Sequence, residues 1–127
     1  MSVKFNVNER GQPGVAGGGD KKFYASPLTK GEVTLEGLTT QIEKISTVSG
    51  ADIRAVLYAM VDVMTNTLAD GKIVRMGELG SLRVSISSEG KATAEEVNAS
   101  CIRNSRVLFA PGKMIKTMLA TLDFTKA

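Results

Sequence analysis

The stretch Val74–Val84 reads VRMGELGSLRV and separates a long apolar helix pattern from a run of alternating residues. The helix pattern ends at Asp70-Gly71, and the next residues predict a strand over Lys72–Met76. The chain is then expected to turn through Gly77-Glu78 and to begin a second strand at Leu79. We interpret this strand–turn–strand hinge as the start of a hairpin saddle that forms the working face of the protein.

Two amphipathic helices are predicted before this hinge. Thr34 is a suitable N-cap, and apolar residues recur at helical spacing from Leu35 to Ile45. Ser49 begins a second helix, whose apolar stripe consists of Ile53, Val56, Leu57, Met60, Val63, Met64 and Leu68. Because its flanks are apolar too, this helix has too little polar surface for the outside of a monomer. It is either the central helix of a small domain or, as we favour, a helix that a partner chain covers.

The residues after the hinge predict a hairpin. Leu79–Ser88 alternates apolar and polar side chains, so one face of this strand is expected to be buried and the other to contact water. The polar segment from Glu89 to Asn98 is expected to form a tip or an arm, and Ser100–Phe109 is expected to form the returning strand.

A last helix is predicted after the hairpin, with Pro111 in its first turn. Lys113 and Lys116 lie within its first two turns, where cations oppose the helix dipole. A bound anion would explain them, because backbone N–H groups at a helix start favour phosphate, but two ordinary solvated lysines are the alternative. The apolar face of this helix consists of Met114, Ile115, Met118, Leu119 and Leu122.

The first residues form a separate extension in this interpretation. Ser2–Asn8 alternates as a half-buried strand does, Gly11–Gly19 is a glycine-rich loop, and Lys22–Ser26 is a short return strand. The loop lacks the Gly-Lys-Ser/Thr ending of a phosphate-binding P-loop. We therefore predict two domains, a β-hairpin extension over residues 1–33 and a main domain over residues 34–127.

The charge of the chain is compatible with a nucleic-acid partner but does not prove one. The 127 residues carry a net charge of +3. Residues 71–127 carry nine Lys/Arg against five Asp/Glu, whereas residues 1–70 carry seven against eight. The basic excess therefore lies entirely in the half that contains the hairpin.

Several classes of function are not expected. The chain has no histidine, which excludes histidine-based catalysis and metal binding, and its acids show no paired spacing. Cys101 is the only cysteine, so no internal disulfide can form. We find no membrane-spanning run and no signal peptide, and we expect a soluble cytoplasmic protein. An enzyme, a cofactor and a small-molecule substrate are not predicted.

From about Leu35 to Leu119 the chain resembles the HU/integration-host-factor family of bacterial histone-like DNA-binding proteins. Leu68–Leu82 is similar to that family's helix end, first strand and Gly-Phe-Gly-Thr-Phe turn. Phe109–Lys116 is similar to its Phe-Lys-Pro-Gly-Lys-x-Leu-Lys signature, and Ser49–Asp62 fits its second helix without a gap. The N-terminal extension is similar to that of the longer HU-like proteins of Bacteroidetes.

The resemblance implies an α+β fold and an intertwined homodimer. Two N-terminal helices form its base, an antiparallel β-saddle with a short arm follows, and a C-terminal helix and the N-terminal β-hairpin complete the chain. In this family the arms reach around the minor groove, and a proline at each tip wedges between base steps. The implied function is largely sequence-independent binding of double-stranded DNA at the nucleoid, through its backbone and minor groove.

The expected DNA contacts come mainly from cations that neutralise phosphates. The resemblance also places Gly80 and Ser81 at the tight turn of the saddle. The full set of expected DNA-binding residues is Lys113, Lys116, Arg103, Arg106, Arg83, Lys91, Gly80 and Ser81.

The chain departs from the family pattern in its arm. No proline lies between Leu82 and Phe109, and serines stand at the family's arm arginines, at Ser85 and Ser87. The segment between the strands is also shorter than the usual arm and contains Glu95-Glu96, and Ala110 replaces a common lysine. We therefore expect weaker or differently organised DNA binding, with less sharp bending than in typical HU.

A second hypothesis is a structural or assembly protein that keeps the HU scaffold but binds another protein. The N-terminal hairpin would then add strands to a partner's sheet edge. The low net charge and the acidic arm favour this hypothesis, while the basic second half opposes it.

Overall fold

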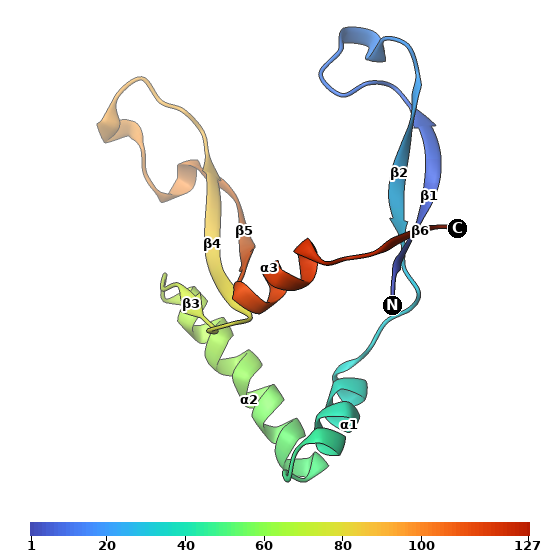
Figure 1. The fold of residues 1–127 in the computed structure, drawn as a ribbon. Coiled ribbons are helices and arrows are strands. Elements are labelled where there is room, and N and C mark those ends of the chain that lie inside the picture. Colours follow the sequence, from blue (N-terminus) through green and yellow to red (C-terminus); the bar gives the residue numbers. More distant parts are fainter. The chain divides into compact units, whose positions relative to one another are not determined.

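The computed structural model describes residues 1–127 and divides them into two compact units. Unit 1 comprises Met1–Thr34 together with Leu119–Ala127, and unit 2 comprises Leu35–Met118. The chain has three α-helices and two three-stranded sheets (Figure 1). The predicted α+β class is thus confirmed, whereas the dimeric architecture stays a prediction.

The predicted N-terminal hairpin forms in unit 1. Strand β1 (Val3–Arg10) pairs with β2 (Lys22–Leu28) in antiparallel register, with Arg10 opposite Lys22 and Lys4 opposite Leu28. The loop between them contains the short 3₁₀ turn η1 (Ala16–Gly18). Four of the loop glycines have a positive φ, a conformation that a side chain would disfavour, which explains the glycine-rich composition.

A third strand of this sheet comes from the other end of the chain. Strand β6 (Phe124–Lys126) pairs in parallel with β1, and Val3 lies opposite Phe124. The Val3 N–H donates to the Asp123 carbonyl at 2.8 Å, and the Ala127 N–H donates to the Phe5 carbonyl at 3.0 Å. Sequence patterns did not reveal this strand, because three residues are too few to show an alternation.

Removing residues 121–127 should loosen the N-terminal hairpin, since an isolated two-stranded hairpin is marginally stable in water. We expect faster amide hydrogen exchange throughout β1 and most clearly at Val3, which loses its acceptor. Amide hydrogen exchange in the helix over residues 50–69 of unit 2 serves as the internal control and should not change. Unaltered protection of β1 in the truncated chain would contradict the role assigned to β6.

Unit 2 begins with the two predicted helices, α1 (Leu35–Ile45) and α2 (Gly50–Ala69). As predicted, Ser49 caps α2, and its hydroxyl accepts a hydrogen bond from the Asp52 N–H at 3.3 Å. The buried side chains between the helices are Ile53, which is 6% exposed, and Thr39, whose hydroxyl donates to the Leu35 carbonyl. Arg54 of α2 also donates two hydrogen bonds to the carboxylate of Glu36, at 2.8 and 2.9 Å.

The ion pair between Glu36 and Arg54 gives this helix pair a pH dependence. The hydrogen bonds from Arg54 lower the pKa of Glu36 and raise that of Arg54. A carboxyl with a lowered pKa stabilises the folded state above its unfolded pKa, and this contribution is lost as the pH falls through the lowered value. Because both side chains are exposed, the effect should be small and should weaken with salt.

Glu36→Gln should therefore lower the urea midpoint slightly at pH 7 and should have progressively less effect as the pH falls through the lowered pKa. Asp62→Asn serves as the control, because it removes from α2 an exposed carboxylate that forms no ion pair. Equal effects of the two substitutions at every pH would rule out a specific contribution from this pair.

Most of the apolar stripe of α2 is uncovered within the chain. Val56 and Val63 are each 64% exposed, and Met60 is 42% exposed. The buried apolar residues of the whole chain are Ile53 and Cys101. An apolar stripe of this kind is normally covered by another surface. Within this chain, the face of α2 that we predicted a partner chain to cover is exposed.

The second sheet has the order β3-β4-β5, with β3 (Val74–Arg75), β4 (Gly80–Ser88) and β5 (Ile102–Pro111). The first strand is shorter than the predicted Lys72–Met76, because only its two residues pair with β4. The turn comprises residues 77–79 and is closed by the Met76 N–H, which donates to the Gly80 carbonyl at 2.8 Å. Placing Gly80 and Ser81 at the tight turn was wrong, since both residues are in β4.

The end of unit 2 also differs from the prediction. Pro111 is the last residue of β5 and lies opposite Gly80, so it is not in the first turn of the last helix. Helix α3 (Lys113–Ala120) begins two residues later and ends before Leu122, which therefore is not on its apolar face. Pairing with β4 extends β5 through Pro111, which a proline allows at the end of an edge strand.

Candidate nucleic-acid interface

The register of β3, β4 and β5 sorts their side chains onto two faces, because directly paired residues share a face. One face carries the apolar pairs Leu82–Phe109 and Val84–Val107. The other, the arginine face, contains no acidic residue. It consists of Arg75, Ser81, Arg83, Ser85, Ser87, Asn104, Arg106, Leu108 and Ala110.

The three arginines of this face are exposed, and none forms an ion pair with a carboxylate. Arg83 and Arg106 are diagonal neighbours on β4 and β5, since Arg106 lies opposite Ser85. Arg75 lies opposite Ser81 and adds a third cation on β3. Arginine side chains and hydroxyl and amide donors are all groups that contact phosphate oxygens in protein–DNA complexes.

Two glycines bring the β3–β4 turn against the start of α3. The Gly112 N–H donates to the Leu79 carbonyl at 2.9 Å. A Cβ atom at Gly112 would lie 2.4 Å from the Glu78 oxygen, and one at Gly80 would lie 2.3 Å from the Ala110 oxygen. Gly80 also has a φ of +139°, which residues with side chains rarely adopt. Only glycine fits at either position, so this pair sets where α3 begins.

Helix α3 therefore starts beside the arginine face. The Gly112 carbonyl accepts the first helical hydrogen bond, from the Lys116 N–H at 2.9 Å. A depression of about 360 Å³ at this corner is lined by Arg75, Ser81 and Gly112, among others. Lys113 and Lys116 are exposed and form no ion pair. Since N–H groups in the first turn lack helical partners, cations and backbone donors suited to an anion meet here.

The tip of the β4–β5 hairpin is a compact, closed loop over residues 89–101, with the 3₁₀ turns η2 (Ala94–Glu96) and η3 (Ala99–Cys101). The Glu89 N–H donates to the Cys101 carbonyl at 2.8 Å. Cys101 is 3% exposed, and its Sγ lies 3.6 Å from the Glu96 carbonyl oxygen. The cysteine thus fills the interior of the tip, as expected of a small packing residue.

A carboxylate at the base of this tip pairs with two of the predicted cations and offsets part of their charge. Glu89 pairs with Lys91 and with Arg103, each at 3.6 Å. The register shifts between Ser87 and Ser88, which leaves Arg103 as the extra residue of a bulge. Lys91 and Arg103 therefore lie outside the arginine face, and Glu89 offsets part of their charge.

Comparison with known proteins identifies the family of this chain. The sequence profile of HU-HIG, described as an HU domain fused to wHTH, Ig, or glycine-rich motif, matches residues 1–126. The chain belongs to the HU-HIG family. This confirms the resemblance to HU-like proteins seen in Leu68–Leu82 and Phe109–Lys116.

A solved structure from Bacteroides vulgatus, described as a "Putative bacterial DNA binding protein", has a similar fold, with a TM-score of 0.65 at 16% identity. The match covers 98% of this chain and 49% of that one, so the HU-HIG chain spans about half the length of its structural neighbour. Comparison with curated proteins gives no match.

The HU-HIG chain brings some of the predicted site residues together and separates others. Arg83, Arg106 and Ser81 share the arginine face, and Lys113 and Lys116 lie in the first four residues of α3, which follows Gly112 at its corner. Lys91 lies in the tip and Arg103 at its base, where both pair with Glu89. Gly80 is buried and acts through its backbone. Sequence reasoning missed Arg75, although its alternation with Val74 within the predicted strand was a usable signal.

No group of three or more His, Cys, Asp or Glu side chains lies close enough together to hold a metal ion. None of the three helices combines the length and hydrophobicity that crossing a bilayer requires.

Proposed function

We propose that this HU-HIG chain is a nucleoid-associated protein that binds double-stranded DNA with little sequence preference. The observation that carries the proposal is the acid-free arginine face, which adjoins the lysine-bearing start of α3. The description of the Bacteroides vulgatus structural neighbour as a DNA-binding protein supports it. The role is one of binding rather than catalysis, it needs no cofactor, and it implies a location on the nucleoid in the cytoplasm.

Phosphate neutralisation supplies the affinity in this proposal. Lys113, Lys116, Arg83 and Arg106 contact the backbone, and the Ser81 hydroxyl and first-turn N–H groups of α3 donate to phosphate oxygens. Arg75 joins this set. The polar side chains of this face are cations and small hydrogen-bond donors, and they include no set suited to reading base edges. Sequence preference is therefore low.

We infer that the acting form is a homodimer. The exposed stripe of α2 needs a cover, and an identical helix of a second copy matches it in length and hydrophobicity. Two copies would also double the number of phosphate contacts. This would explain how a chain of modest net charge binds a polyanion.

Bending should be weaker than in HU proteins with proline-tipped arms. The loop over residues 89–101 contains no proline. Its three acids, Glu89, Glu95 and Glu96, outnumber the nearby cations Lys91 and Arg103, so the tip is not cationic. A wedge between base steps needs an apolar side chain pushed into the minor groove. A closed loop held by the Glu89–Cys101 hydrogen bond has little freedom to supply one.

Duplex binding measured by fluorescence anisotropy against salt concentration tests this function. Binding that is similar for unrelated sequences and weakens steeply with salt is expected. End-to-end energy transfer on the same duplex should report a smaller bend than a proline-armed HU protein produces. No binding at low salt would rule out the proposed function.

The alternative of a protein-binding assembly factor is favoured by one observation, the neutralised tip. Lys91 and Arg103 already have a carboxylate partner, so the hairpin end is better suited to another protein than to phosphates. This function would be preferred if the full chain failed to bind DNA at low salt but still formed a complex with another protein.

A further inference from the structure

The sheet of unit 1 places three of its four basic residues on one face. Alternate residues of β1 share this face with their partners in β2, such as Arg10 with Lys22 and Asn8 with Tyr24. We call it the N-terminal basic face. It consists of Lys4, Asn6, Asn8, Arg10, Lys22, Tyr24, Ser26, Leu28 and Thr125. It contains no acidic residue, since Glu9, the only acid in the three strands, alternates to the opposite side.

Contacts within the face hold its polar side chains in place. The Arg10 guanidinium lies 5.0 Å from the centroid of the Tyr24 ring. The Asn8 amide donates to the Ser26 hydroxyl. Neither Lys4, Arg10 nor Lys22 forms an ion pair with a carboxylate. An arginine stacked on an aromatic ring keeps its N–H groups free for an anion while losing side-chain freedom beforehand.

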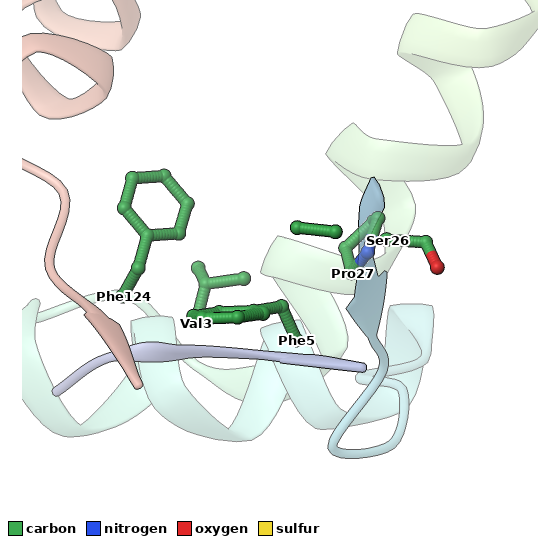
Figure 2. Close-up of a pocket in the computed structure, with 6 residues that line it drawn as sticks. Val3, Phe5, Ser26, Pro27 and Phe124 are labelled. Atoms are coloured by element: carbon green, nitrogen blue, oxygen red, sulfur yellow. The ribbon is translucent and has the colours of Figure 1, made fainter. Parts of the chain in front are cut away.

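The opposite face of the same sheet is mostly apolar, and its charged residues are Glu9 and Lys126. Figure 2 shows Val3, Phe5 and Phe124 gathered on one side of β1 and β6, with Pro27 of β2 beside them. These residues line a pocket of about 340 Å³. The apolar face is the one that burial would stabilise, so the N-terminal basic face is the side of the sheet that remains in contact with solvent.

We propose that the N-terminal basic face is a second DNA-contacting surface, which binds the phosphate backbone of the duplex. Its residue types fit, because cations alternate with amide and hydroxyl donors of the kind that contact phosphate oxygens. Its size fits too, since Lys4 and Arg10 are six residues apart on a strand, or about 20 Å. That length matches about six base pairs of duplex.

This inference rests on the proposed function of the arginine face. Both surfaces belong to one chain, so contact by the first raises the effective concentration of the second at the same duplex. The extension would then add affinity without adding sequence preference. It would also offset the phosphate contacts that the neutralised hairpin tip does not supply.

The test is a salt titration of duplex binding by the full chain with Lys4→Gln/Arg10→Gln/Lys22→Gln. The matched control, Lys21→Gln/Lys30→Gln/Lys126→Gln, removes the same charge from exposed positions of unit 1 off this face. Each phosphate contact contributes about 0.9 to the slope of log Kobs against log salt. Loss of three cations should therefore reduce this slope by about 2.7 for each copy of the N-terminal basic face that contacts the duplex. The control should reduce it far less.

A charge-preserving variant separates binding from folding. Lys4→Arg/Arg10→Lys/Lys22→Arg keeps three cations and should keep the wild-type slope. Equal slopes for the face variant and its control would overturn the inference while leaving the function of the arginine face intact. Binding of duplex DNA by the wild-type chain is measured first. If the wild-type chain does not bind, both proposals are overturned.

Discussion

Gly112→Ala should destabilise unit 2 by about 3 kcal/mol, at the upper end of what overpacking costs. The added Cβ would lie 2.4 Å from the Glu78 oxygen and 2.8 Å from the Gly80 nitrogen. These are backbone atoms, which cannot move aside as the end of a flexible side chain can. Gly80→Ala should cost a similar amount, because its Cβ meets the Ala110 oxygen and its φ is +139°. Urea unfolding at fixed protein concentration measures both effects.

The other glycines of unit 2 supply graded controls. Gly90→Ala meets open space without a positive φ, so it should change stability by no more than about 0.5 kcal/mol. Gly71→Ala also meets open space, but its φ of +80° should cost about 1 kcal/mol. If Gly112→Ala proved as mild as Gly90→Ala, the close approach of the turn to α3 would be wrong.

The same substitution should affect function in the fraction of chains that stay folded. Relieving the clash at Gly112 requires the start of α3 to move away from the β3–β4 turn. This changes the depression that Gly112 lines together with Arg75 and Ser81. We therefore expect Gly112→Ala to weaken duplex binding even at temperatures where circular dichroism reports a folded chain.

Lys113→Ala/Lys116→Ala should cause the largest loss of DNA affinity of any double substitution in the chain. A homodimer loses four cations at the anion-binding corner. The salt slope should fall by about 3.6 if each lysine contacts one phosphate, at about 0.9 per contact. At 0.1 M salt this corresponds to an affinity loss on the order of a thousandfold.

Folding should not explain that loss. Lysines in the first turn oppose the helix dipole, so removing them should leave the melting temperature unchanged or slightly raised. Lys44→Ala/Lys72→Ala removes equal charge from exposed positions elsewhere in unit 2 and should have a much smaller effect on the slope. If the double alanine variant keeps wild-type affinity and slope, the two lysines are not part of a DNA interface.

The helices and the main strands could be predicted from the sequence, because their signals are local. The stripe from Ile53 to Leu68 repeats at helical spacing, and Ser49 stands where a capping hydroxyl is needed. The alternation of Leu82, Val84 and Ile86 likewise identifies β4. Each of these patterns depends on neighbours two to four residues apart, which the sequence displays directly.

The candidate site was only partly predictable. Lys113 and Lys116 attracted attention because they contradict the preference of a helix start, and this reasoning needs no tertiary structure. Lys91 and Arg103 looked equivalent to Arg83 and Arg106 in the sequence. Their separation depends on the bulge after Ser87 and on the carboxylate of Glu89, which only the hairpin register brings to them.

By itself, then, the sequence determined the order of the helices and of the longer strands, the HU-like family and the cations at the start of α3. The tertiary structure decided which cations share a face, why Gly80 and Gly112 cannot carry side chains, and that β6 completes the sheet of β1. The physical reason is that these features are contacts between segments far apart in the chain. Backbone hydrogen bonds set their register, and a shift of one residue would turn every side chain to the other face.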